Sequence, residues 1–368
     1  MEQISSYFKN GYVHAGRLQE LDALRGLAAL GVVFFHYTHN QPHLSPDFTF
    51  RYGITGVDLF FMISGFTISL SLNKITHWKS FILNRFGRLY PAFWVCALIT
   101  SAFILVYDFQ HFNLVDVLIN MTMVPAYFGI EDLDGSYWTL AIEFAFYLWI
   151  LSVYMAGKIN NIETSGLLTL VGILAFHFFR PFYPALYALV VTKIQLINHF
   201  PLFFSGILFY QLSSRGFWVK NMLLMIISVL ASLYLYDKGG RSMYLISDRE
   251  HMLIILFYHV LFALLICGKM KFMARPQLVF LGTISYSLYL LHQNMGRKII
   301  DSLMMQTNAN IYVVISLVIL LDIFLAYLVT RFIEIPANNY IRNGRQRTVA
   351  QVAVTRAADS SNTLHSQA

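Results

Sequence analysis

Long apolar runs recur along the whole chain, and they restrict its possible folds more than any other feature. A helix needs about 20 mostly apolar residues to cross a membrane, and a chain in lipid satisfies its backbone polar groups only in helices or a closed barrel. Ten runs between charged or Pro- and Gly-rich breaks are candidates: about 22–39, 56–73, 89–107, 136–156, 164–180, 199–213, 219–236, 250–268, 278–297 and 310–333. We therefore expect an all-α, polytopic membrane bundle of about ten transmembrane helices.

The composition agrees with a membrane protein built from one bundle. The chain is 57% hydrophobic and 12% charged, whereas soluble domains have about 25% charged residues. We expect one transmembrane domain over 1–342. The polar stretch 343–368 cannot bury enough apolar surface to order itself and is expected to be a disordered cytoplasmic tail. Cys96 and Cys267 lie inside apolar runs, which argues against a disulfide framework and a metal cluster.

The distribution of basic residues predicts the orientation. Lys and Arg outnumber Asp and Glu by 26 to 19, and in a membrane protein such an excess usually holds cytoplasmic loops in place, rather than binding nucleic acid. With the N-terminus inside, the inner loops hold about twice as many Lys and Arg residues as the outer loops. Both termini are therefore expected to be cytoplasmic. The outer loop 108–135 has several acidic residues and no Lys or Arg.

The first run, LDALRGLAALGVVFFHY at 21–37, carries a cation and an imidazole on one face. Arg25 and His36 are eleven residues apart, which is about three helical turns and about 16 Å along the axis. An imidazole can take and return a proton near neutral pH. Ionisable groups inside a membrane are usually functional, although His36 could instead be a hydrogen-bonded core residue. The shared face favours a polar cavity.

The second run contains GVDLFFMISGF at 56–66, with Asp58 near its start and Ser64 further in. We expect both to line the cavity. Asp58 could equally be a charge that faces the positive end of the helix dipole.

The segment NRFGRLYP at 84–91 places two arginines on one helical face. Arg85 and Arg88 are three residues apart, and two guanidinium groups side by side fit a phosphate. We group Tyr90 with them as a cofactor-binding candidate. The alternative is that both arginines only anchor the cytoplasmic end of the helix.

The fourth run begins GSYWTLAIEFAFYL and contains a carboxylate among apolar residues. Ser136, Thr139 and Glu143 form one polar stripe by their spacing. A buried carboxylate is costly unless it is paired or protonated, and Glu143 could orient a histidine or pair with Arg25. Two aromatic residues of the same motif are also expected to line the cavity, Tyr137 and Trp138.

The ninth run begins LGTISYSLYLLHQ, and its spacing places Ser285, Tyr289 and His292 on one face. This polar wall is expected to shape a cavity rather than to transfer protons. Asp322 in the tenth run is another intramembrane carboxyl, for which the sequence indicates no partner.

Taken together, these motifs resemble the acyltransferase-3 family of integral membrane acyltransferases. The matching segments occur in the expected order: LDALRGLAALGVVFFH, GVDLFFMISGF, RFGRLYP, SYWTLAIEFAFYL and LGTISYSLYLLH. The resemblance implies transfer of an acyl group, commonly acetyl, from cytoplasmic acyl-CoA to a hydroxyl of a cell-surface saccharide such as exopolysaccharide or O-antigen. It is closest to a stand-alone subgroup without an SGNH-type hydrolase domain, located in the bacterial inner membrane.

The resemblance also implies roles for individual residues. The family's catalytic pattern falls on Arg25, His36 and Glu143, and its RxxR pattern on Arg85 and Arg88. Acetyl-CoA or another acyl-CoA would be the co-substrate, with no metal. The partners would be a saccharide or lipid-linked saccharide acceptor and membrane lipids, with an oligomer left open. In the expected mechanism His36 deprotonates the acceptor hydroxyl and Glu143 orients His36. A covalent acyl-histidine also stays open.

Several alternatives compete with this interpretation. A succinyl donor, or a small lipid or antibiotic acceptor, would fit the same motifs. A proton-coupled secondary transporter would also bury His and Glu, but transporters commonly show internal repeats, and none is visible here. A purely structural membrane protein would have little reason to bury Arg25, His36 and Glu143.

Overall fold

The structure is a computed structural model that describes residues 18–72, 77–238 and 244–341, and within these ranges it contains helices and turns but no β-strand. The all-α prediction is confirmed for this part of the chain. The predicted tail at 343–368 lies outside the described residues. The α-helices are α2 Gln19–Thr38, α3 Gly56–Leu72, α4 Trp78–Tyr107, α5 Leu114–Asn120, α6 Trp138–Met155, α7 Ile162–Phe178, α8 Pro184–Lys193, α9 Leu196–Arg215, α10 Val219–Leu235, α11 Asp248–Ile266, α12 Pro276–Leu291, α13 Arg297–Gln306 and α14 Ile311–Val329.

Each of the ten apolar runs falls on a helix, but the predicted count of ten spans is not confirmed. Seven helices of the described chain are long and apolar enough to cross a membrane, and the bent pair α8 and α9 would make an eighth. The other two runs fall on helices that are not among these candidates. Helix α2 carries charged residues in its first turns, and α12 has only 16 residues. A π-helix, His292–Gly296, follows α12 directly and leads into α13. The cytoplasmic location of the termini stays a prediction.

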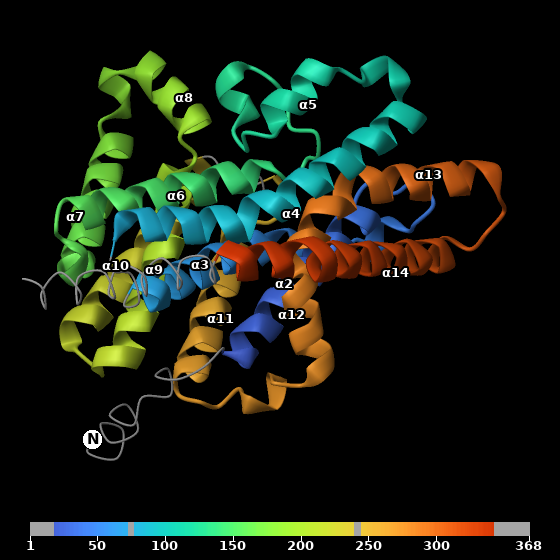
Figure 1. Cartoon of the computed structure of the whole chain (residues 1–368). Helices are drawn as coiled ribbons and strands as arrows, with labels where there is room; N and C mark the ends of the chain where they lie inside the picture. Colours follow the sequence, from blue (N-terminus) through green and yellow to red (C-terminus); the bar gives the residue numbers. More distant parts are fainter. Residues whose placement is uncertain (1–17, 73–76, 239–243, 342–368) are drawn as a thin grey trace, which may run out of the picture.

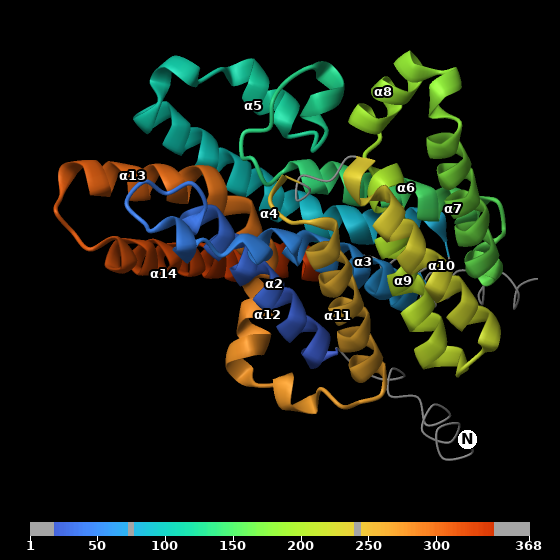
Figure 2. The same cartoon turned by 180° about the vertical axis from the view of Figure 1, so that it is seen from behind.

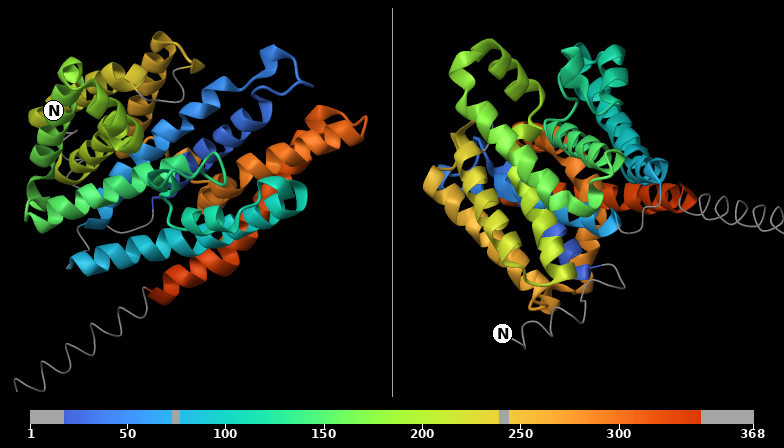
Figure 3. Two further views of the ribbon diagram at one scale, coloured as in Figure 1. Left: turned by 90° about the horizontal axis from the view of Figure 1, so that it is seen from above. Right: turned by 90° about the vertical axis from the view of Figure 1, so that its left-hand side faces the viewer.

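Helix α2 lies in the middle of the bundle (Figure 1). It packs most extensively against α12 and also contacts α3, while α3 packs against α9 and α9 against α10. Helix α14 runs beside α12 and continues into a second π-helix, Thr330–Glu334. Figure 2 shows the same arrangement of helices from behind. In Figures 1 and 3 the short helices α5 and α8 project from one side of the bundle.

Glycines allow the central helices to approach each other closely. A Cβ at Gly282 would lie 2.0 Å from the carbonyl oxygen of Asp22, and one at Gly26 would lie 2.5 Å from the backbone of α12. Gly65 of α3 and Gly206 of α9 form a similar contact. Small residues at helix crossings are the usual means of close packing in membranes. Here they bring the polar faces of α2 and α12 together.

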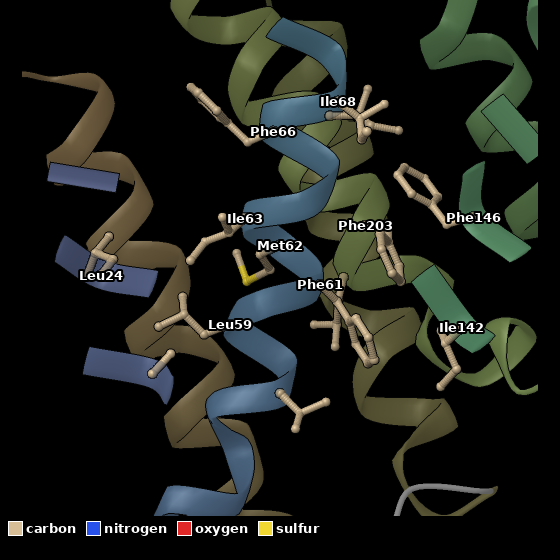
Figure 4. Packing of buried hydrophobic residues seen from close by; sticks show 14 of the residues in the cluster. Leu24, Leu59, Phe61, Met62, Ile63, Phe66, Ile68, Ile142, Phe146 and Phe203 are labelled. Atoms are coloured by element: carbon tan, nitrogen blue, oxygen red, sulfur yellow. The ribbon is translucent and has the colours of Figure 1, made fainter. Parts of the chain in front are cut away.

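Apolar side chains fill the other side of α3. Phe61 stacks on Phe203 of α9 with 4.8 Å between ring centroids, and Phe203 stacks on Phe146 of α6 at 4.2 Å. In Figure 4, α3 lies between these aromatic rings and Leu24 of α2. The packing fixes α3 and α6 relative to α2, so side chains on their inner faces meet at defined positions.

Substitution of Gly282 by Ala should destabilise the protein, because the new Cβ collides with the backbone of α2. Overpacking of a tight contact costs about 1–3 kcal/mol, which should lower the thermal unfolding midpoint of the protein in detergent. Gly172→Ala is the matched control, since nothing lies within 4 Å of its Cβ position in α7. Equal midpoints for the two variants would contradict the close contact between α2 and α12.

Candidate active site

A cavity of about 70 Å³ lies among α2, α3, α4, α6 and α12. Apolar residues such as Phe60 and Leu140 form part of its wall. It brings together polar side chains from five separate sequence motifs: Arg25, Ser64, Arg88, Thr139, Glu143, Ser285 and Tyr289. The structure thus places side chains from five helices around one interior space.

Glu143 is held by one hydrogen bond from the neighbouring helix α3 and one from the next turn of its own helix, α6. Its Oε1 atom accepts a hydrogen bond from Ser64 Oγ at 2.9 Å and another from the hydroxyl of Tyr147. Arg25 and Arg88 both interact electrostatically with this carboxylate, and Arg25 also forms an ion pair with Asp22 at 3.4 Å. The two donors and the two nearby cations offset the cost of burying a carboxyl group inside the bundle.

His36 does not contact Glu143 in this structure. Its Nδ1 atom lies 2.8 Å from Nε2 of His292, and Nδ1 of His292 lies 2.8 Å from the carbonyl oxygen of Tyr289. A carbonyl can only accept, so Nδ1 of a neutral His292 carries the proton and its Nε2 is an acceptor. Nδ1 of His36 must then be the donor, which leaves Nε2 of His36 without a proton. With both rings neutral, these hydrogen bonds leave Nε2 of His36 as a possible proton acceptor.

The segment that carries His292 is anchored on both sides. The hydroxyl of Tyr37 donates to the carbonyl oxygen of His292 at 2.7 Å and also contacts the buried carboxyl of Asp322. Asp134 accepts a hydrogen bond at 2.7 Å from the backbone nitrogen of Asn294. Sequence spacing could not show these contacts because His292 begins a π-helix, where the α-helical period changes. The one sequence feature that pointed to these contacts was Asp322, a carboxyl inside an apolar run for which no partner had been assigned.

One aromatic layer separates the cavity from the histidine pair. The ring of Tyr289 lies 5.6 Å from that of Phe60 in an edge-to-face contact and 5.7 Å from the ring of His292. Its hydroxyl oxygen accepts a hydrogen bond from Thr139 at 3.0 Å. Phe60 and Tyr289 line the cavity, so the His36–His292 pair lies directly behind its wall.

Arg85 lies next to the cavity and has unused hydrogen-bond donors. Its Nη2 atom is 3.5 Å from Ser71 Oγ, and its guanidinium group lies over the rings of Phe81 and Tyr147 at 5.8 and 5.7 Å. Its Nε and Nη1 atoms are buried and have no hydrogen-bond partner. Buried guanidinium donors of this kind fit an anionic group such as a phosphate.

Glu334, which the sequence analysis did not single out, is a further acidic group near the arginines. It ends the π-helix Thr330–Glu334, and its Oε2 atom accepts hydrogen bonds from Thr330 at 3.3 Å and Ser287 at 3.5 Å. It interacts electrostatically with Arg88 and Arg25. Within the described residues, no group of three His, Cys, Asp or Glu side chains is placed to hold a metal ion.

The remaining predicted site residues lie outside the cavity lining. Asp58 is buried, and its Oδ2 atom is 3.8 Å from Nε2 of His251 on α11. Tyr137 and Trp138 precede the cavity-facing turn of α6. Tyr137 packs against an aromatic ring of α4, and Trp138 lies near His199 of α9. These positions follow from helix geometry, since each residue lies on a different face from Ser64 or Glu143.

Tyr90 also lies outside the cavity lining. Its hydroxyl donates to the carbonyl oxygen of Thr122 at 3.2 Å, and its ring stacks on Phe86.

The fold is a bundle of apolar helices around a cavity that Arg25, Arg88 and Glu143 line, and sequence comparison identifies the class of the protein. The chain belongs to the acyltransferase-3 family, since the family's sequence model, described as an acyltransferase domain, matches residues 18–330. It is therefore an acyltransferase and an integral membrane protein, which answers the transporter alternative. No solved structure matches the chain.

Individual relatives agree with this class. A protein of Acidianus two-tailed virus, provisionally named an acetyltransferase, is 24% identical over 276 residues, which cover 73% of this chain and 80% of the relative. A protein of Staphylococcus aureus (strain COL), provisionally named an O-acetyltransferase, is 27% identical over 86% of this chain and 56% of its own length. Nodulation protein 10 of Rhizobium leguminosarum bv. viciae is 27% identical over 36% of this chain and 43% of the relative. The chain thus spans about half the length of the last two.

The contact between Tyr37 and Asp322 can be tested by a double-mutant cycle. Tyr37→Phe leaves the buried carboxyl of Asp322 without this hydrogen-bond partner, and such a loss costs about 1–3 kcal/mol. The unfolding midpoint should therefore fall. In an Asp322→Leu background the same substitution should have a much smaller effect. Tyr312→Phe, at an exposed position of α14, is the control. Additive effects of the two substitutions would contradict the interaction.

Proposed function

We propose that the protein is an O-acetyltransferase of the bacterial inner membrane. It transfers an acetyl group from cytoplasmic acetyl-CoA to a hydroxyl of a cell-surface saccharide, with His36 as the general base. The observation that carries the proposal is the pairing of two features along α2. Arg25 lines the cavity near one end of the helix, and His36, in the tautomer of a base, lies about 16 Å further along.

The arginine end of the cavity suits the donor. Coenzyme A carries several phosphate charges, and Arg85 has two buried guanidinium nitrogens without a partner. Arg88 lines the cavity one helical turn further along. Phosphates held by these groups would leave the extended pantetheine arm directed into the bundle. The thioester at its end would approach the histidine pair past Phe60 and Tyr289.

The proposed step uses the free nitrogen of His36. Nε2 of His36 takes the proton of the acceptor hydroxyl while the oxygen attacks the thioester carbonyl. The new C–O bond forms, the C–S bond breaks, and the proton passes to the leaving thiolate, giving the ester and free CoA. The transient imidazolium donates through Nδ1 to His292, which in turn donates to the carbonyl of Tyr289.

The expected role of Glu143 changes in this arrangement. Since its hydrogen bonds go to Ser64 and Tyr147, we assign it to balancing the charge of Arg25 and Arg88 in the empty cavity. His292 takes the orienting role that sequence analysis gave to Glu143.

The proposal predicts that His36→Ala loses acetyl transfer but keeps donor binding. Removal of a general base lowers the rate by about 100- to 10,000-fold. Purified protein in lipid nanodiscs would be incubated with acetyl-CoA and saccharide fragments, and acetylated sugar would be measured by mass spectrometry. Acetyl-CoA binding, measured by calorimetry, should stay within about twofold. His259→Gln, at a buried histidine of α11 outside this site, is the control. Full transfer by His36→Ala would overturn the assignment.

Arg85→Ala should raise the KM for acetyl-CoA with little change in kcat. Loss of hydrogen bonds to a charged group costs about 1.5–3 kcal/mol, which corresponds to about a 10- to 150-fold rise. Arg85→Lys should recover only part of the affinity, because an ammonium lacks the planar fork. Arg215→Ala removes a cation of α9 that pairs with Glu163 and should leave the KM unchanged. An unchanged KM for Arg85→Ala would exclude a role in donor binding.

A further inference from the structure

A second cavity, of about 90 Å³, lies on the opposite face of α6 from the reaction cavity. Trp138, Ala141 and Ile142 line this second cavity. Thr139, Leu140 and Glu143, which lie on the other face of the same helix, line the first. The other walls of the second cavity come from the turn Pro125–Phe128, from Asp132 and from the junction between α8 and α9. Helix α8, whose residues Thr192 and Lys193 belong to this lining, projects from the same side of the bundle as α5 (Figures 1 and 3). We call this second cavity the lateral pocket.

The chemistry of the lateral pocket differs from that of a lipid groove. Its lining combines the aromatic side chains of Tyr127 and Trp138 with a carboxylate, an amide, a hydroxyl and an ammonium group, from Asp132, Gln195, Thr192 and Lys193. A sugar ring presents an apolar C–H face and a rim of hydroxyls that both donate and accept hydrogen bonds. Aromatic surface with a few convergent polar groups is the usual composition of a small-ligand site.

The pocket is joined to the catalytic region by the segment 132–138. Asp132 and Trp138, at the two ends of this segment, line the lateral pocket. Between them, Asp134 accepts a hydrogen bond from the backbone of Asn294, and Ser136 Oγ donates to the carbonyl oxygen of Tyr289 at 3.0 Å. The same short segment therefore forms a wall of the pocket and holds the helix that carries His292.

His199 lies between an aromatic side chain of one cavity and an aromatic side chain of the other. Its ring lies 5.8 Å from Trp138, which lines the lateral pocket, and 5.0 Å from Phe61, which lines the reaction cavity. His199 is 7% exposed, and its Nε2 atom is buried without a hydrogen-bond partner. A buried polar nitrogen without a partner is unusual in a folded protein, and here it lies between the aromatic side chains of the two cavities.

We propose that the lateral pocket binds the acceptor as a neutral saccharide; this rests on the proposed acetyl transfer. The charges favour a neutral ligand, because the pocket carries one carboxylate and one ammonium group, and Lys193 already donates to the carbonyl of Ala126. The nearby loop is acidic, and of its carboxylates Asp108 is held by Lys298 and His111, whose hydrogen bonds keep the pKa of Asp108 below its usual value. An anionic sugar would meet repulsion from the remaining acidic groups.

The test measures saccharide binding and donor binding separately on the full chain in nanodiscs. Maltotriose, cellotriose and chitotriose are the neutral probes, trigalacturonic acid is the anionic probe, and binding is followed by saturation-transfer NMR. At least one neutral probe should bind. Trp138→Ala should raise its Kd by about tenfold or more, as expected for truncating an aromatic anchor. Asp132→Asn, which preserves shape, should also weaken it. Trp218→Ala, an exposed tryptophan outside the pocket, should not.

The outcomes separate this proposal from the proposed function. Acetyl-CoA binding should be unchanged in Trp138→Ala and Asp132→Asn, and the KM for the saccharide should rise with little change in kcat. If wild-type protein transfers acetyl groups but neither substitution changes saccharide binding, the pocket assignment is wrong and the function stands. Failure of all three neutral probes to bind, or equal binding of trigalacturonic acid, overturns the neutral-saccharide class. Failure of wild-type protein to bind acetyl-CoA overturns the proposed function instead.

Discussion

The close contact between α2 and α12 is the constraint on which the rest of the structure depends. Each helix carries a polar face that would be costly against lipid, and Gly26 and Gly282 let the two backbones approach until these faces meet. At one end the contact places Arg25 in a cavity with Ser285, and at the other it places His36 against His292. A single helix pair therefore sets both ends of the proposed reaction path.

The charges inside the bundle explain how such a site can exist before a donor binds. Arg25 and Arg88 interact with Glu143 and Glu334, and the carboxylates are further held by hydroxyl donors. A buried charge without a compensating charge is costly, so the carboxyl groups of Glu143 and Glu334 offset the charges of the two arginines. Arg85 differs, because two of its donor atoms are unused. A phosphate can bind there without first displacing a carboxylate, which lowers the cost of capturing an anionic donor.

The sequence predicted the elements and their polar faces better than the contacts between them. Helical spacing assigned Arg25 and Glu143 to polar helix faces, and both lie inside regular α-helices and line the cavity. Spacing within one helix cannot show which helices meet. Glu143 was therefore expected to orient His36, whereas in the structure it accepts a hydrogen bond from Ser64. Spacing also fails where the period changes: His292 begins one π-helix, and Glu334 ends another. Insertions of this kind often occur at functional positions, and they redirect side chains that an α-helical count assigns to another face.

The aromatic layer between the cavity and the histidine pair has a consequence for the order of events. Tyr289 supports His292 through its backbone carbonyl, while its ring and hydroxyl form part of the cavity wall. A side-chain movement that admits the thioester can therefore leave the backbone hydrogen bond intact, and with it the tautomer of His36. The neutral hydrogen bond from Thr139 to the Tyr289 hydroxyl costs only about 1 kcal/mol to exchange. In the proposed reaction, His36 can thus stay oriented while the cavity wall in front of it opens. Donor entry would move the ring and hydroxyl of Tyr289, whereas proton transfer depends on its backbone carbonyl.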